Sequence, residues 1–76
     1  MQIYIGNLSE MTTAQQLARL FLPFGSVQFS HIERDKRTGR SLRFGFIEMD
    51  MVSARSAIQK LNQILFMNAY VEVAAV

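Results

Sequence analysis

Two short segments place aromatic side chains at alternate positions, the spacing that puts them on one side of a β-strand. Tyr4 lies between two isoleucines, and Phe44 and Phe46 are separated by a single glycine. Alternation along a strand leaves these rings opposite the neighbours that would be buried. A large side chain kept out of the core forgoes ~1.5–3 kcal/mol of burial free energy, so clustered exposed rings usually mark a binding surface. Such rings can stack on unpaired nucleobases.

A run of basic residues lies just before the second aromatic segment. Within ten positions it is offset only by Asp35, although the net charge of the whole chain is only +2. A local basic patch attracts phosphates more effectively than the total charge suggests. The alternative is an ordinary solvated hairpin loop. The members of the run are Arg34, Lys36, Arg37, Arg40 and Arg43.

The composition argues against several classes of protein. There is no cysteine, hence no disulfide and no thiolate metal site. The only histidine, His31, has no evident catalytic or metal-binding partners, so we predict no enzyme activity, no metal and no cofactor. The N-terminus does not resemble a secretory signal, and the apolar runs are much shorter than the ~20 residues that span a bilayer. We expect one cytoplasmic domain over residues 1–76, without membrane contact.

Periodicity predicts the elements that must position these residues. Residues 2–5 alternate as a half-buried strand, and Thr13 with Gln16 forms a capping box for a helix that begins near Ala14 and stops by Pro23 and Gly25. Residues 27–34 and 43–49 indicate two further strands joined by a polar turn in which Gly39 can adopt a positive φ. Asp50 can cap a second helix, and residues 70–73 indicate a last strand.

This order predicts an α+β fold, the ferredoxin-like βαββαβ sandwich, with a four-stranded antiparallel sheet and two helices on one face. The other face stays open to solvent. Alternation assigns Tyr4, Phe44, Phe46, Tyr70 and His31 to the open face. The helix side receives the core residues Ile3, Ile5, Ile32, Gly45, Ile47, Met49, Val71 and Val73.

Two segments at these positions resemble the paired motifs of the RNA-recognition-motif family. The hexamer is Ile3-Tyr4-Ile5-Gly6-Asn7-Leu8, and the octamer, residues 42–49, matches best at Phe44-Gly45-Phe46-Ile47. The resemblance covers essentially the whole chain and is similar in particular to the small single-domain bacterial members. It implies binding of single-stranded RNA. Tyr4 and Phe46 would stack successive bases, and Phe44 would lie between sugars.

The chain departs from the family pattern at several positions. Leu42 stands where the octamer opens with a basic residue, and Arg43 stands where glycine is usual. Glu72 occupies a position in the last strand that is often basic, and with Glu33 and Glu48 it puts carboxylates near a surface meant for a polyanion. Loss of the basic octamer contact weakens the expectation of tight binding.

The predicted RNA-binding residues are therefore Tyr4, Phe44, Phe46, Arg43, Arg40, Arg37, Lys36, Tyr70, His31 and Gln2. Single-stranded DNA remains open as the ligand. The main alternative is a protein-interaction domain on the same scaffold, with a partner or a second copy contacting Ile64, Leu65, Phe66 and Met67. The other interpretation of that segment is that it folds over the edge of the core.

Overall fold

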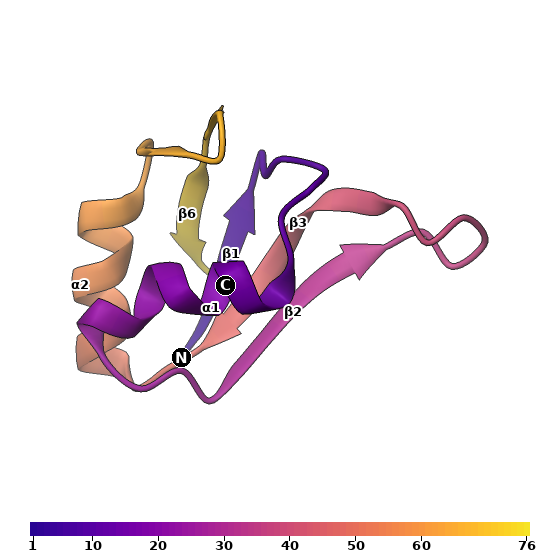
Figure 1. Ribbon diagram of the computed structural model, residues 1–76. Helices are drawn as coiled ribbons and strands as arrows, with labels where there is room; N and C mark the ends of the chain where they lie inside the picture. Colours follow the sequence, from indigo (N-terminus) through magenta and orange to yellow (C-terminus); the bar gives the residue numbers. More distant parts are fainter.

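Two helices pack against one side of an antiparallel sheet, in the predicted element order. The computed structural model describes residues 1–76, and the four-stranded sheet has the order β2-β3-β1-β6 (Figure 1). A separate two-stranded hairpin is formed by β4 and β5. No helix is long and apolar enough to cross a lipid bilayer. The elements are β1 (Gln2–Gly6), α1 (Ala14–Phe21), the 3-10 turn η1 (Leu22–Phe24), β2 (Phe29–Arg34), β3 (Ser41–Glu48), α2 (Met51–Leu61), β4 (Leu65–Phe66), β5 (Ala69–Tyr70) and β6 (Glu72–Ala75).

Both helices begin at the caps that the sequence predicts. The Thr13 hydroxyl accepts a hydrogen bond from the Gln16 backbone N–H at 3.1 Å, and the Gln16 side chain accepts one from the Thr13 N–H at 3.0 Å. Asp50 accepts a hydrogen bond from the Ser53 N–H at 3.1 Å at the start of α2. These bonds satisfy N–H groups that have no partner within the helix. Pro23 lies in η1, where α1 gives way to a tighter turn.

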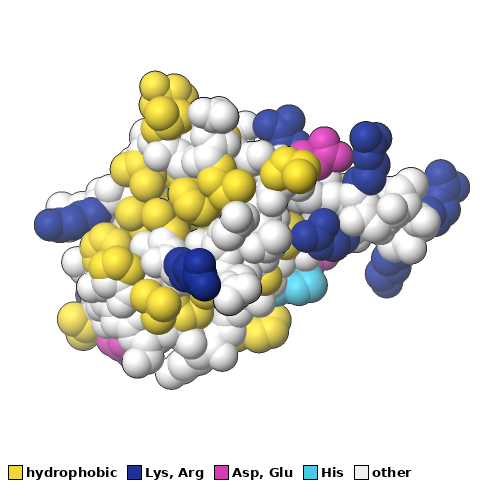
Figure 2. All heavy atoms as spheres, viewed as in Figure 1, with side chains coloured by type: hydrophobic (Ala, Val, Ile, Leu, Met, Phe, Trp, Pro, Cys, Tyr) yellow, Lys and Arg dark blue, Asp and Glu magenta, His cyan; other side chains and the backbone are white.

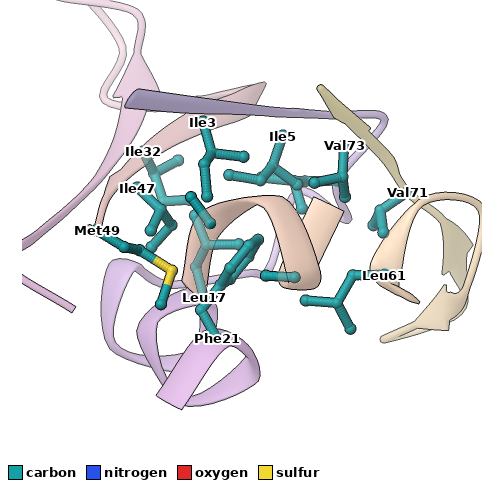
Figure 3. Close-up of a cluster of buried hydrophobic side chains, with 13 residues drawn as sticks. Ile3, Ile5, Leu17, Phe21, Ile32, Ile47, Met49, Leu61, Val71 and Val73 are labelled. Carbon is teal, nitrogen blue, oxygen red and sulfur yellow. The ribbon is translucent and has the colours of Figure 1, made fainter. Parts of the chain in front are cut away.

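The core lies between the sheet and the two helices. Ile3 and Ile5 of β1 point toward Leu17 and Phe21 of α1, as Figure 3 shows, and all four are fully buried. The predicted helix-side residues of the sheet are all buried, which confirms the assignment of faces. Ser30 is the polar exception on this side of β2. Its hydroxyl donates to the Ala14 carbonyl at 2.7 Å, which offsets the cost of removing it from water.

The β2–β3 hairpin extends beyond the body of the molecule (Figure 1) and contains an irregularity. Ile32 pairs with Gly45 and Arg34 pairs with Ser41, so three residues of β3 lie opposite one residue of β2. Arg43, within this bulge, has φ 68°, a left-handed conformation that simple strand alternation does not predict. At the tip, Gly39 has the predicted positive φ, 76°. The strands begin at Phe29 and Ser41, two residues away from the predicted starts.

The prediction for the last strand is wrong at both ends. The strand that joins the main sheet, β6, spans Glu72–Ala75, whereas Tyr70 belongs to the small hairpin and pairs with Leu65. The turn of this hairpin consists of Met67 and Asn68, with φ of 50° and 64°. Positive φ at both central residues is the pattern of a two-residue turn whose twist matches its strands. The predicted connection thus contains a hairpin of its own, and Tyr70 is not on the four-stranded sheet.

Candidate nucleic-acid interface

A row of residues crosses the open face of the sheet. Tyr4 of β1 is the Cα partner of Ala74 on one side and of Phe46 on the other, and Phe46 in turn pairs with His31 of β2. Register partners point to the same face of a sheet. Since Ile3 and Ile5 point into the core, Tyr4 and the rest of the row point away from the helices. The pairing therefore brings three predicted site residues together on the predicted face.

Three aromatic rings form a cluster within this surface. The ring centroids of Tyr4 and Phe44 are 5.9 Å apart, those of Tyr4 and Phe46 are 6.1 Å apart, and those of Phe44 and Phe46 are 6.0 Å apart. The planes are tilted or edge-on, at 34°, 64° and 89°. Such packing holds the rings in place while each stays half-buried rather than covered. No pocket interrupts the surface of the molecule, so the cluster is an open platform.

Gly6 allows the Tyr4 ring to lie over the end of β1. A Cβ atom built on Gly6 would overlap the Tyr4 hydroxyl and would lie 2.8 Å from Cε2 and Cζ of the ring. Any other residue would have to push the ring away. The glycine of the hexamer is therefore required by close approach of a neighbouring side chain rather than by its own φ.

Two carboxylates near the open face have partners that the sequence did not indicate. Glu33 Oε1 is 2.8 Å from His31 Nε2, and Glu48 Oε2 is 2.9 Å from the N-terminal ammonium of Met1. Glu72 has no ion-pair partner, and it pairs in register with Gly6 on the open side. Of the three glutamates that should repel a polyanion, Glu72 is thus the one without a compensating cation.

The basic run lies on the protruding hairpin, where Figure 2 shows Lys and Arg side chains gathered. The carboxylate of Asp35 accepts hydrogen bonds from the N–H groups of Arg37 and Thr38, at 2.8 and 3.1 Å, and so shapes the turn. Arg40 Nε lies 3.2 Å from Glu10 Oε1, in an exposed pair between this hairpin and the loop after β1. The side chains of Lys36 and Arg37 make no hydrogen bond or ion pair and project into solvent.

Arg43 is held differently from the other basic residues. Its Nε donates to the Leu8 carbonyl at 2.9 Å, and its own carbonyl accepts from the Leu8 N–H at 2.9 Å. Arg43 thus ties the β2–β3 hairpin to the loop that follows β1. One of its N–H groups is committed to the fold, so it is a poorer candidate for phosphate contact than Lys36 or Arg37.

Two of the predicted site residues and one unpredicted residue complete the picture. Gln2 pairs with Glu48 at the end of the sheet and is exposed. Tyr70 is also exposed, but it stands on the β4–β5 hairpin, where its carbonyl accepts a hydrogen bond from the Asn7 side chain at 2.8 Å. Phe29 was not predicted as a site residue. Its position on the same face as His31 could have been found from the alternation of β2.

Comparison with known proteins decides the family. The sequence model of the RNA recognition motif matches residues 3–72. The chain belongs to the RNA recognition motif family. It is 39% identical over 74 residues to RbpE of the cyanobacterium Nostoc sp., a match that covers 96% of this chain and 75% of RbpE. It is 40% identical over 62 residues to the small ribosomal subunit protein cS22 of Arabidopsis thaliana, of which it spans only 24%.

Solved structures of other RNA recognition motifs have the same fold. The crystal structure of RNA-binding protein PG1 superposes with a TM-score of 0.95 at 37% identity, covering 97% of this chain and 90% of that chain. The RNA recognition motif of Rna15 with bound GU RNA superposes with a TM-score of 0.87 at 28% identity, covering 99% and 81%. The predicted fold class and family are therefore confirmed.

Proposed function

We propose that this RNA recognition motif binds single-stranded RNA on the open face of its sheet, with Tyr4 and Phe46 stacking successive bases and Phe44 packing against sugar. The observation that supports it most directly is the register of the three central strands, which sets Tyr4, Phe46 and His31 side by side on the solvent side. A base stacked on an exposed aromatic ring gains ~1–3 kcal/mol. The family and the RNA-bound relative support the same ligand.

The phosphates would be met by the side chains that project from the hairpin. Lys36 and Arg37 have no competing partner, while Arg40 exchanges its exposed pair with Glu10 for a phosphate. Exposed ion pairs contribute only ~0–1 kcal/mol, so this exchange costs little. Binding should depend on few phosphate contacts and on no catalysis. We place this function in the cytoplasm, in agreement with the lack of cysteine.

An NMR titration with a short random-sequence RNA tests the proposal. Backbone resonances of residues 2–5, 43–48 and 72–75 should shift, and those of α1 and α2 should not. The control is the same titration on a Tyr4→Ala, Phe46→Ala double variant, which should show small shifts only. Shifts confined to the helices would contradict the proposal. A single-stranded DNA of the same length, titrated in parallel, shows whether the site requires the 2′-hydroxyl.

A protein-binding role is the second candidate, and the structure narrows it to one hairpin. Ile64 and Phe66 pack against the core, which supports the expectation that their segment folds over the core edge. Leu65 and Tyr70, however, are register partners that remain 58% and 62% exposed. Shifts confined to residues 65–70 on addition of RNA, or dimerisation lost in a Leu65→Ser variant, would favour contact with a protein or with a second copy.

A further inference from the structure

A second aromatic pair lies on the open face, on edge strand β2. The rings of Phe29 and His31 have centroids 6.0 Å apart and planes inclined by only 21°, so they are stacked, unlike the tilted rings of the central cluster. Phe29 remains 55% exposed although it occurs in a regular strand. The proposed use of Tyr4, Phe44 and Phe46 leaves this pair without a role.

The position of the pair continues the line of the proposed site. His31 is the register partner of Phe46, and Phe29 lies two residues before it on the same side of β2. Neighbouring strands are ~4.8 Å apart, so β2 carries the row one step beyond Phe46. A strand of RNA that crosses from β1 to β3 would reach β2 next.

The charge around the pair suits a nucleobase rather than a phosphate. Glu33 Oε1 lies 2.8 Å from His31 Nε2, which fixes the orientation of the imidazole and gives it an anionic neighbour. Glu48 is the register partner of Phe29. Carboxylates on both sides disfavour a phosphate here, whereas the face of a base tolerates them. Exposed aromatic surface in this setting fits stacking.

We propose that Phe29 and His31 form a further stacking position, which accepts the nucleobase next to the one on Phe46. This inference rests on the proposed function and extends its site to a third strand. Glu33 acts as a positioning residue through His31. The site would then hold at least one nucleotide more than Tyr4 and Phe46 can stack.

The first test is affinity as a function of RNA length. Phe29→Ala should weaken binding of a tetranucleotide by roughly fivefold or more, the lower end of the stacking range, and should leave binding of a dinucleotide unchanged. Phe29→Tyr should keep the wild-type affinity for both. Val52→Ala is the matched control, since Val52 is 80% exposed on α2, on the other side of the molecule.

The second test uses the absence of tryptophan from the chain. Phe29→Trp introduces a single fluorophore, and a base stacked on the indole should quench its emission. We expect quenching with the tetranucleotide but not with the dinucleotide, and none for Val52→Trp with either.

The outcomes separate this inference from the function on which it rests. If Tyr4→Ala and Phe46→Ala weaken binding while Phe29→Ala matches the wild type at every length and Phe29→Trp is not quenched, the β2 position is wrong and the proposed function stands. If none of these variants changes affinity, the proposed function fails as well. Phe29 lies outside the core, and spectra of each variant without RNA verify that it folds.

Discussion

Arg43 and Leu8 hold each other through two hydrogen bonds, each 2.9 Å long. The Leu8 N–H donates to the Arg43 carbonyl, and Arg43 Nε donates to the Leu8 carbonyl. Arg43 makes these bonds from a left-handed backbone conformation, φ 68°, inside the bulge of β3. The resemblance to the family leads one to expect glycine here, which adopts that conformation without strain.

This relationship predicts an unusual order of stability among variants. A non-glycine residue in the left-handed region costs roughly 1–2 kcal/mol. Arg43→Ala keeps that strain and loses the bond from Nε, whereas Arg43→Gly loses the same bond but removes the strain. Arg43→Gly should therefore be more stable than Arg43→Ala by about 1 kcal/mol, measured by urea unfolding. Equal stability of the two variants would show that the backbone at Arg43 is not strained.

Phe46→Ala should weaken RNA binding by ~1–3 kcal/mol and leave the fold intact, because the ring is a platform on the open face. Tyr4→Ala should behave in the same way. Calorimetric titration of both single variants and the double variant completes a mutant cycle. The losses should not add fully, since the rings are 6.1 Å apart and touch successive bases. Unchanged affinity in either single variant would contradict stacking at that ring.

Gly6→Ala should damage the platform without removing any aromatic residue. The new Cβ would occupy the position of the Tyr4 ring, which must swing away or force the backbone to move. Both RNA affinity and stability should fall. In a Tyr4→Ala background the clash is absent, so Gly6→Ala should cost much less there. A cost that is the same in both backgrounds would place the origin of the effect in the strand and not in the ring.

Glu72→Lys should strengthen RNA binding, most clearly at low salt. Glu72 is the open-face carboxylate without an ion-pair partner, and screening acts over ~8 Å at physiological salt. Gln59→Lys, exposed on α2, is the control for a general effect of charge. Affinities of the variants at two salt concentrations should differ more for Glu72→Lys. If it binds no better than Gln59→Lys, the RNA does not pass over β6.

The cap of α2 should make stability depend on pH in the acid range. Hydrogen bonding from the Ser53 backbone N–H lowers the pKa of Asp50, since it favours the ionised carboxylate. The stabilisation is complete above the pKa of the unfolded chain and is lost as the pH falls through the lower pKa of the folded state. Asp50→Asn keeps an acceptor but cannot ionise. Thermal unfolding should show wild type more stable near neutral pH and the difference vanishing in acid.

Local patterns in the sequence determined most of the platform. The alternation around Tyr4 and around Phe44 and Phe46 correctly assigned both faces of the central strands, because successive residues of a strand must point in opposite directions. The capping residues Thr13 and Asp50 correctly marked where the helices begin, since their hydrogen bonds involve neighbours three residues away. These relations require no knowledge of distant parts of the chain.

Contacts between distant segments were decided only by the tertiary structure. The segment around Met67 folded into its own hairpin, so Tyr70 left the main sheet and β6 began at Glu72. Arg43 turned toward Leu8, 35 residues away, and Glu33 and Glu48 acquired cations. The physical reason is that strand pairing and ion pairing depend on which segments meet in space. A hydrophobic pattern of period two allows several registers, and only the packing of the whole sheet selects one.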